Sequence, residues 1–385
     1  MDSETVFEVQ SEVTDEALAE SASYIGKKLR IEQYTHEATR DTIRRYAWGI
    51  GDDNPLWCDP NYAASGPFGT IVAPPTFLYS VFQQGIAPGL AGLQPFYTGV
   101  EWMWHRLPRR GEEILAEASL AASAEVKGGK GGRMILQTGH VRYLSGNGDV
   151  LAVATPRVLR VPRPDGSGRR MYEVKDQRRY TAEELKQIEA DVLHEHRRGE
   201  EPRYWEDVSL EDALQPVVKG PIDTIAMTSY YAGSIGSEGY KACELRWSQW
   251  RAARETPDLL PNNHDISYLS EFVLPSAGHQ VDKVAHAVGM PAAYDNGAMR
   301  VGWTAHLVTN WMGDAGFLRS LSARLRGANS LGNTTWISGH VVRKFRDARG
   351  EHAVEVAITG ADQDGAVNTE GRAIVWLPVR ESAGR

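Results

Sequence analysis

The spacing of apolar residues in the first quarter of the chain predicts short helices separated by turns. Residues 43–50 form an apolar run that ends at Gly51. The sequence from Asp52 to Pro55 is typical of a turn, because Asp and Asn side chains bond their own backbone and proline fixes φ. A second short helix is expected around 60–64. A third, apolar helix is expected over 76–85, with Thr76 as its cap.

From Gly99 onward the apolar residues alternate with polar ones, which indicates strands. The runs 99–127, 133–144 and 150–161 are rich in strand-forming residues. Glycine-containing clusters at 128–132 and 146–149 separate them and are typical of hairpin turns. Helices followed by consecutive hairpin-linked strands predict an α+β unit with an antiparallel sheet.

The second half repeats this order. Residues 46–53 can be laid over 231–238 at an offset of 185 residues, and 106–115 over 324–336. A segment at 243–276 interrupts the second copy, and a helix with an apolar face is then expected over 298–311. Short self-similar stretches of this kind indicate a duplicated unit.

Charge divides the chain further. Residues 1–22 are acidic, and 162–205 are rich in charged side chains. Thr181 and Glu184 have the spacing of a capping box, so we expect a solvated linker helix there. The predicted organisation is an arm at 1–22, a first unit at 23–165, a linker at 166–204 and a second unit at 205–380.

Composition narrows the class of protein. The 385 residues carry a net charge of −8, which argues against nucleic acid as a partner. No 18-residue apolar run or signal peptide is evident, so we expect a cytoplasmic protein that does not span a membrane. Cys58 and Cys243 lack the spacing of a metal site and fit a reducing compartment. No metal or cofactor is expected.

The turn at 51–59, GDDNPLWCD, resembles the hydration loop of the MaoC-like (R)-specific enoyl-thioester hydratases and dehydratases. The resemblance is closest to the branch with two hotdog units and a FAS1-like dehydratase region. The matching residues are Gly51, Asp52, Asn54, Pro55, Asp59 and Ala63. Trp57 stands where the family has its catalytic histidine. Ala73-Pro74 replaces the family's His-Gly pair, and Pro74 has no N–H to offer an oxyanion.

In the second half the family pattern is also altered. It falls on Gln280, Asp282, Ala285, Gly289, Asn296 and Gly297. Gln280 takes the place of the family histidine, with His279 beside it. Gly297 is retained and begins a helix, where its N–H can stabilise negative charge.

The resemblance implies a tandem hotdog, in which each unit is a helix wrapped by a curved antiparallel sheet. It also implies a lyase that hydrates an enoyl thioester or dehydrates a 3-hydroxyacyl thioester in fatty acid or polyketide metabolism. The acyl group would be carried by CoA or a carrier protein, and a homodimer is expected. The active tunnel would lie between the two units.

Hydration of a thioester needs a base for water, an acid for the α-carbon and a donor to the thioester oxygen. The catalytic candidates are His279, Asp295 and Gly297. The substrate-binding candidates are Asp52, Asn54, Trp57, Tyr294, Asn296 and Trp303. The candidates for binding the phosphates of the carrier are Arg109, Arg110 and Lys130.

Simpler structural roles compete with each of these assignments. Asp52 and Asn54 can serve the turn alone, Asp295 can be a capping residue, and the basic residues can mark a solvated hairpin. His306 is expected to be an ordinary buried histidine. Two other functions stay open: a non-catalytic hotdog subunit that binds a ligand or supports an active partner, and a hotdog thioesterase using Asp295 or Asp314.

Overall fold

The computed structural model describes residues 12–90, 92–128, 132–163, 172–245, 247–248, 251 and 277–380. Its strands pair antiparallel in the order β1-β3-β4-β5-β2-β7-β10-β9-β8-β6. The strands are β1 (Lys28–Leu29), β2 (Gln94–Trp104), β3 (Ile114–Lys127), β4 (Arg133–Ser145), β5 (Val150–Val161), β6 (Ala213–Lys219), β7 (Phe317–Leu325), β8 (Thr335–Arg346), β9 (His352–Asp362) and β10 (Val367–Trp376). The predicted α+β architecture with an antiparallel sheet is confirmed.

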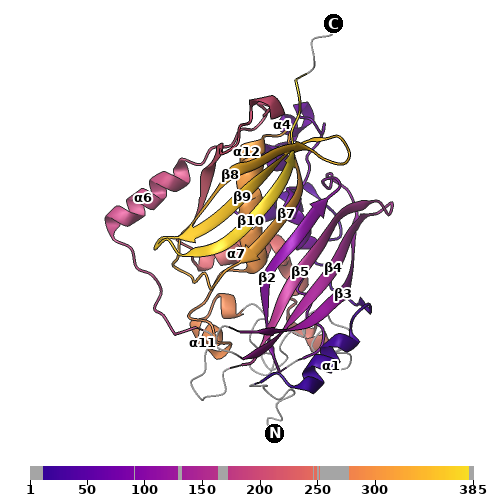
Figure 1. Ribbon diagram of the computed structural model, residues 1–385, viewed down its shortest axis with the longest axis vertical. Coiled ribbons are helices and arrows are strands. Elements are labelled where there is room, and N and C mark those ends of the chain that lie inside the picture. The colour runs from indigo at the N-terminus through magenta and orange to yellow at the C-terminus, as the bar shows by residue number, and fades with distance from the viewer. Residues whose placement is uncertain are drawn as a thin grey trace.

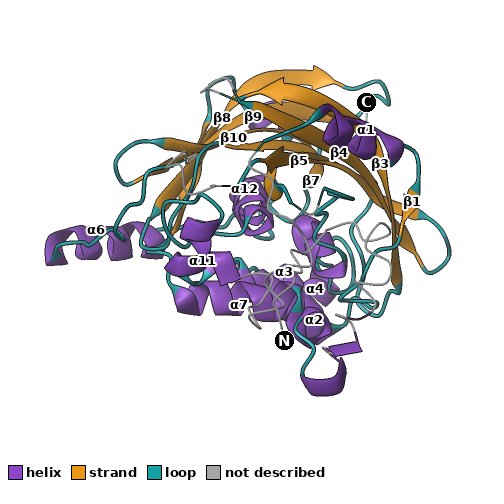
Figure 2. Cartoon of the chain, turned by 90° about the horizontal axis from the view of Figure 1, so that it is seen from below, coloured by secondary structure: helices purple, strands orange, loops and turns teal. Residues whose placement is uncertain are grey.

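The helices lie mostly on one side of this sheet, with α6 projecting beyond its edge (Figure 2). They are α1 (Asp15–Ser23), α2 (Arg40–Gly49), α3 (Pro55–Cys58), α4 (Pro60–Ser65), η1 (Pro75–Phe77), α5 (Leu78–Val81), α6 (Ala182–Leu193), η2 (Trp205–Asp207), α7 (Thr224–Ser234), α8 (Gly236–Gly239), η4 (Ala277–His279), α11 (Asp282–Ala287) and α12 (Gly297–Met312). The sheet curves around them, so its concave face is the wall of the core.

Strands β2 and β7 join the two halves of the sheet edge to edge (Figure 1). Trp102 of β2 is paired with Leu321 of β7 in this register. At Gly99 of β2, a Cβ atom would lie 2.3 Å from the carbonyl oxygen of Ala323, and the φ angle is +152°. Only glycine allows so close an approach, and the joined edges leave no unpaired strand at the centre of the molecule.

Helix α12 lies beneath the concave face of the sheet (Figure 2), and residues 298–312 are buried. Its start is capped by Asn296, whose side chain accepts from the N–H of Ala298 at 2.9 Å. The sequence predicted this helix with a one-sided apolar stripe. That part of the prediction is wrong, because the sheet covers one side and the first-half helices cover the other.

The corresponding helix of the first half is much shorter than the 76–85 predicted. It consists of η1 and α5 and ends at Val81, after which Phe82 is extended with φ −154°. Pro74 and Pro75 contribute no N–H groups, and Gln84 has a φ of +62° that interrupts any continuation. Thr76 is not the cap either, since the N-cap position is Pro74 and no side chain bonds there.

Helices α2 and α7 occupy equivalent positions in the two halves, in agreement with the repeat offset of 185 residues. They cross in close contact: a Cβ on Gly233 would lie 2.3 Å from the carbonyl oxygen of Arg45, and one on Gly49 would lie 3.0 Å from that of Ser229. Both glycines therefore permit the helices to approach. These two helices are the structural counterparts of the repeated segments that begin near residues 46 and 231.

The predicted linker helix is α6, and its capping box is confirmed by reciprocal bonds between Thr181 and Glu184. It projects from the edge of the sheet next to β8 and β6 (Figure 1), where Trp336 donates to Asp191 at 2.9 Å. The predicted unit boundaries stay predictions. Among the described residues, no helix combines the length and apolarity that a bilayer crossing requires.

Candidate functional site

The predicted site residues separate into two groups along α12. His279, Tyr294, Asn296 and Gly297 lie at its N-terminal end. Asp52, Asn54 and Trp57 come from the first half and lie beside its C-terminal half, near His306 and Thr309. Trp303 is buried in the helix between them. The fold therefore does not bring all the predicted residues into one place.

Gly297 begins α12 and lies where the two halves meet. A Cβ here would be 2.8 Å from Cδ1 of Leu325 and 2.9 Å from Cδ1 of Tyr97, a residue of the first half. The N–H of a first helical residue has no partner within the helix. Partial positive charge collects at this end, so the Gly297 amide can donate to an oxygen that gains negative charge.

His279 is held in a defined orientation next to this helix start. Its Nδ1 lies 2.9 Å from the carbonyl oxygen of Tyr294, and its ring centroid is 4.3 Å from that of Tyr294. A carbonyl only accepts, so Nδ1 carries the proton and Nε2 is the acceptor. Burial lowers the pKa of His279, so the imidazole is neutral at neutral pH and can take a proton.

Asp295 is engaged in a buried ion pair. Arg300 donates to it through Nε at 2.7 Å and through a second guanidinium nitrogen, and Asn329 Nδ2 donates at 2.9 Å. Arg300 also donates to the carbonyl oxygen of Asn368 at 2.9 Å. Both carboxylate oxygens already accept strong bonds, so the arrangement favours positioning over the acid–base role suggested by the sequence.

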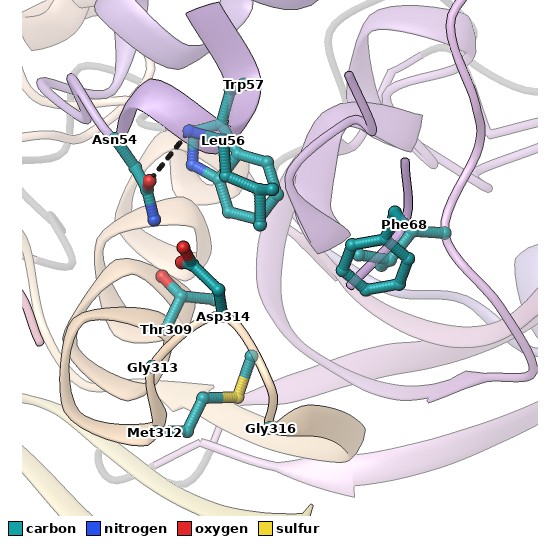
Figure 3. Close-up of a pocket in the computed structure, with 10 residues that line it drawn as sticks. Asn54, Leu56, Trp57, Phe68, Thr309, Met312, Gly313, Asp314 and Gly316 are labelled. Carbon is teal, nitrogen blue, oxygen red and sulfur yellow. Dashed lines mark hydrogen bonds between the residues drawn. The ribbon is translucent and has the colours of Figure 1, made fainter. Parts of the chain in front are cut away.

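In the second group, the turn chemistry read from the sequence is present. Asp52 Oδ1 accepts from the N–H of Asn54 at 3.0 Å, and Asn54 Oδ1 accepts from the N–H of Leu56 at 2.9 Å (Figure 3). Trp57, at the family histidine position, donates its indole N–H to Asp52 Oδ2 at 2.9 Å. Burial raises the pKa of Asp52 to about 6, against the opposing effect of these hydrogen bonds and of Lys219.

His306 faces this turn from α12. Its Nε2 is 3.7 Å from Asp52 Oδ1 and 3.0 Å from Asn310 Nδ2, and both Asp52 and His306 are almost fully buried. Burial, followed by the charges of Lys219 and Arg197, lowers the pKa of His306 well below its usual value. Its Nδ1 has no hydrogen-bond partner within the described ranges. His306 is buried, as the sequence predicted, but among the described residues one of its ring nitrogens lacks the partner that an ordinary buried histidine has.

A pocket adjoins this group (Figure 3). It is lined by Asn54, Leu56, Trp57, Phe68, Leu107, Thr309, Met312, Gly313, Asp314 and Gly316. Asp314 accepts from the hydroxyl of Tyr62 at 2.6 Å, which links α4 to the end of α12. The cavity has a volume of about 10 Å³, enough for one water molecule.

Two of the three phosphate-binding candidates fall in the part of the chain that the structure describes. Arg109 and Arg110 are exposed on the loop between β2 and β3, where their N–H groups bond to Glu112 and to the Ile71 carbonyl. Lys130 lies outside the described residues. Their role stays a prediction.

Sequence reasoning missed several residues of both groups: Tyr97, Arg300, His306 and Asn310. One signal was available for the second group. Gly302, His306 and Asn310 recur every four residues in this helix, which places them on one face. The others depend on contacts between distant parts of the chain.

Comparison with known proteins supports the family resemblance. Residues 23–153 match the FAS1-like, dehydratase domain region. Two curated relatives are named UPF0336 protein. The one from Thermobifida fusca is 32% identical over 74 residues, 19% of this chain and 48% of that protein. The one from Streptomyces avermitilis is 37% identical over 46 residues, 12% of this chain and 31% of that protein. The chain thus spans about half or less of these relatives.

Solved structures extend the likeness over the whole fold. A MaoC-like dehydratase superposes with a TM-score of 0.64 at 16% identity, covering 93% of this chain and 100% of that one. A putative MaoC domain protein dehydratase from Chloroflexus aurantiacus gives 0.55 at 12% identity, with 93% and 96% covered. A Mycobacterium tuberculosis protein described as a double hotdog fold gives 0.52 at 10% identity, with 91% and 96% covered.

These likenesses confirm the double hotdog fold and the predicted resemblance to MaoC-like and FAS1-like dehydratases. Dehydratases and hydratases in general are therefore the class to which the chain is related. At these identities the solved structures establish the fold alone, and the chemistry has to be argued from the site.

Proposed function

We propose that this protein adds water to an enoyl thioester, or removes it from a 3-hydroxyacyl thioester, at the N-terminal end of α12. The observation that carries the proposal is the His279 imidazole, neutral and fixed by the carbonyl of Tyr294, three residues before the helix start at Gly297. A base with an available acceptor nitrogen and an oxyanion donor at one helix start are the groups that this chemistry needs.

In the hydration direction, Nε2 of His279 takes a proton from water while the water oxygen bonds to the β-carbon. Negative charge then develops on the thioester oxygen, and the Gly297 N–H stabilises it. The same imidazole returns the proton to the α-carbon, so no cofactor is consumed. Dehydration follows the same steps in reverse.

Asp295 acts in this scheme as a positioning residue. It lies between Tyr294, whose carbonyl orients His279, and Asn296, which caps α12. Its bonds to Arg300 and Asn329 fix the backbone that both neighbours depend on. The thioester would be carried by CoA or a carrier protein in the cytoplasm, with Arg109, Arg110 and Lys130 as candidate phosphate contacts and a homodimer as the expected assembly.

The test is to incubate the purified protein with enoyl thioesters of increasing chain length and to follow the enoyl absorbance and free thiol together. Loss of absorbance without thiol release is expected for at least one chain length. Thiol release alone would identify a thioesterase instead. No change with any substrate, alone or with cell extract, would leave the non-catalytic subunit as the surviving alternative.

A further inference from the structure

Tyr231 of α7 connects the histidine of the proposed mechanism with the cap of α12. Its ring centroid lies 6.2 Å from that of His279. Its hydroxyl oxygen lies 3.3 Å from Nδ2 of Asn296, the residue that caps α12. Tyr231 is 3% exposed. One buried side chain therefore reaches both the imidazole and the residue that directly precedes Gly297.

The hydrogen bond to the Tyr294 carbonyl does not by itself fix the imidazole of His279. A single bond at Nδ1 leaves the ring some freedom to turn, and Nε2 would move with it. Two aromatic rings restrict this motion: the centroid of Tyr294 lies at 4.3 Å with a tilt of 58°, and that of Tyr231 at 6.2 Å with a tilt of 52°. Tilted ring pairs at such separations attract each other. The ring of Tyr231 therefore helps to decide where the acceptor nitrogen of His279 points.

The hydroxyl of Tyr231 gives the side-chain amide of Asn296 a second anchor. Asn296 Oδ1 accepts from the Ala298 N–H at 2.9 Å, while its Nδ2 donates to the Tyr231 oxygen. Burial raises the pKa of Tyr231 well above its usual value, so the hydroxyl stays uncharged. An amide that is bonded at both ends stays in place at the helix start. Because Gly297 is the first residue after this cap, the hydroxyl acts on the position of its N–H through Asn296.

The crossing of α2 and α7 determines where Tyr231 lies. Gly233, two residues further along α7, is so near α2 that an added Cβ would be 2.3 Å from the carbonyl oxygen of Arg45. Tyr231 is also the repeat counterpart of Tyr46, which precedes it by 185 residues. Tyr46 contacts the middle of α12, where its hydroxyl oxygen would be 3.4 Å from a Cβ on Gly302. The two tyrosines hold equivalent places in the repeat but contact different parts of α12.

We propose that Tyr231 is a positioning residue that holds His279 and the Gly297 amide in a fixed arrangement. The inference rests on the proposed function, because it names the side chain that keeps the base and the oxyanion donor of that reaction in place. Tyr231 takes no proton and touches no reacting atom: its ring acts through His279 and its hydroxyl acts through Asn296. A displacement of about 1 Å in a reacting group can slow a reaction by about 100-fold, so this arrangement matters for the rate.

Two replacements separate the two contacts. Tyr231→Phe keeps an aromatic ring against His279 and removes only the hydroxyl, whereas Tyr231→Leu removes both. The matched control is Tyr46→Phe, which removes the buried hydroxyl at the equivalent place of the first half and leaves His279 and Asn296 untouched.

Nitrogen NMR of the His279 ring, assigned with His279→Gln, reads the imidazole without substrate. We expect the proton on Nδ1 in the parent, Tyr231→Phe and Tyr46→Phe, and signals shifted towards a mixture of both tautomers in Tyr231→Leu. Hydrogen exchange of the Ala298 N–H reads the cap and should become faster by about threefold or more in both Tyr231 variants, but not in Tyr46→Phe. If the ring signals and the Ala298 exchange rate of folded Tyr231→Leu both match the parent, the positioning role is overturned.

Turnover of an enoyl thioester then connects these contacts to the chemistry. We expect kcat to fall by about 10-fold in Tyr231→Phe, with KM within about threefold of the parent, and by about 100-fold or more in Tyr231→Leu. Tyr46→Phe should turn over like the parent. If both folded Tyr231 variants keep the parent kcat, the inference falls and the proposed function stands. If the parent turns over no thioester, the proposed function falls, and the NMR and exchange measurements alone decide whether Tyr231 positions His279 and Asn296.

Discussion

A histidine lies near each end of α12, and the two histidines are held by different kinds of contact. At the N-terminal end, His279 is oriented by a backbone carbonyl and lies beside a helix start that favours negative charge. At the C-terminal half, His306 is oriented by Asn310 and faces a carboxylate in a nearly dry interior. The first histidine bonds to the backbone, whereas the second contacts side chains from both halves.

The two halves also differ in whether the first residue of their central helix has a free backbone N–H. In the first half, Pro74 has no N–H that could donate to a negatively charged oxygen. The helix that follows it ends at Val81. In the second half, Gly297 preserves that amide at the start of a helix of 16 residues. The first half has instead kept the acidic turn, which now faces the helix of its partner unit.

The largest expected effect comes from breaking the ion pair beneath the N-terminal end. Asp295→Ala would leave Arg300 buried without its carboxylate, and we expect the free energy of unfolding to fall by about 3–5 kcal/mol. The side chains of both residues are at most 4% exposed. Denaturant unfolding measures this loss. The control is Asp207→Ala, which breaks an exposed ion pair with Arg380 and should lower the free energy of unfolding by less than about 1 kcal/mol.

If Asp295→Ala leaves the free energy of unfolding almost unchanged, the positioning role is contradicted. A double replacement, Asp295→Leu with Arg300→Met, should recover much of the lost stability, because a buried pair can often be exchanged for apolar residues. If that double variant refolds but loses turnover while binding thioester normally, the pair is needed for orientation as proposed.

The next effect concerns pH and separates Asp52 from His306. Burial raises the pKa of Asp52 from 3.8 to about 6, so between these values the native state binds more protons than the unfolded state. Stability due to Asp52 therefore falls as pH rises through this range, by about 3 kcal/mol at most. Burial lowers the pKa of His306, so the native state binds fewer protons than the unfolded state below pH 6.5. The stability due to His306 therefore falls as pH drops below 6.5.

Single replacements should expose these opposing trends. Relative to the parent, Asp52→Asn should gain stability as pH rises from about 4 to about 6, whereas His306→Gln should gain it as pH falls below about 6.5. Denaturant unfolding from pH 4.5 to pH 8 gives both curves. Asp53→Asn, altered at a side chain that is 82% exposed, should follow the parent. Parallel curves for all proteins would show that the pair is not buried as described.

The smallest effect concerns the cap of α12. Asn296→Ala removes the side chain that accepts from the Ala298 N–H, and we expect about 1 kcal/mol of lost stability. Asn296→Ser or Asn296→Asp should restore most of it. If Asn296→Ala is neutral in unfolding and in turnover, the helix start is not the organised anion site that we describe.

The sequence predicts much of this fold because the relevant signals are local. The turn at Asp52 and Asn54, the capping box of Thr181 and Glu184 and the strand runs all depend on neighbours within a few residues. The length of the helix predicted over 76–85 was overestimated, because an apolar run alone does not show that the backbone becomes extended at Phe82.

The site is harder to predict because its contacts are not local. Asp52 and His306 come together only when β2 and β7 join the two halves. Asp295 was chosen as an acid–base group because it precedes Gly297, and nothing in the local sequence shows that Arg300 and Asn329 claim both of its oxygens. His279, in contrast, lies next to the altered family position and could be selected from the sequence.

The most direct test of the central claim is the turnover of one enoyl thioester by the parent protein, His279→Gln and His286→Gln. The control is apt because His286 also bonds a backbone carbonyl, that of Pro291 at 3.0 Å, but is given no part in the chemistry. On a long-chain substrate, we predict a loss of about 100-fold or more in kcat for His279→Gln and parent-like turnover for His286→Gln. Equal turnover by all three folded proteins would contradict the assignment of the active site to the start of α12.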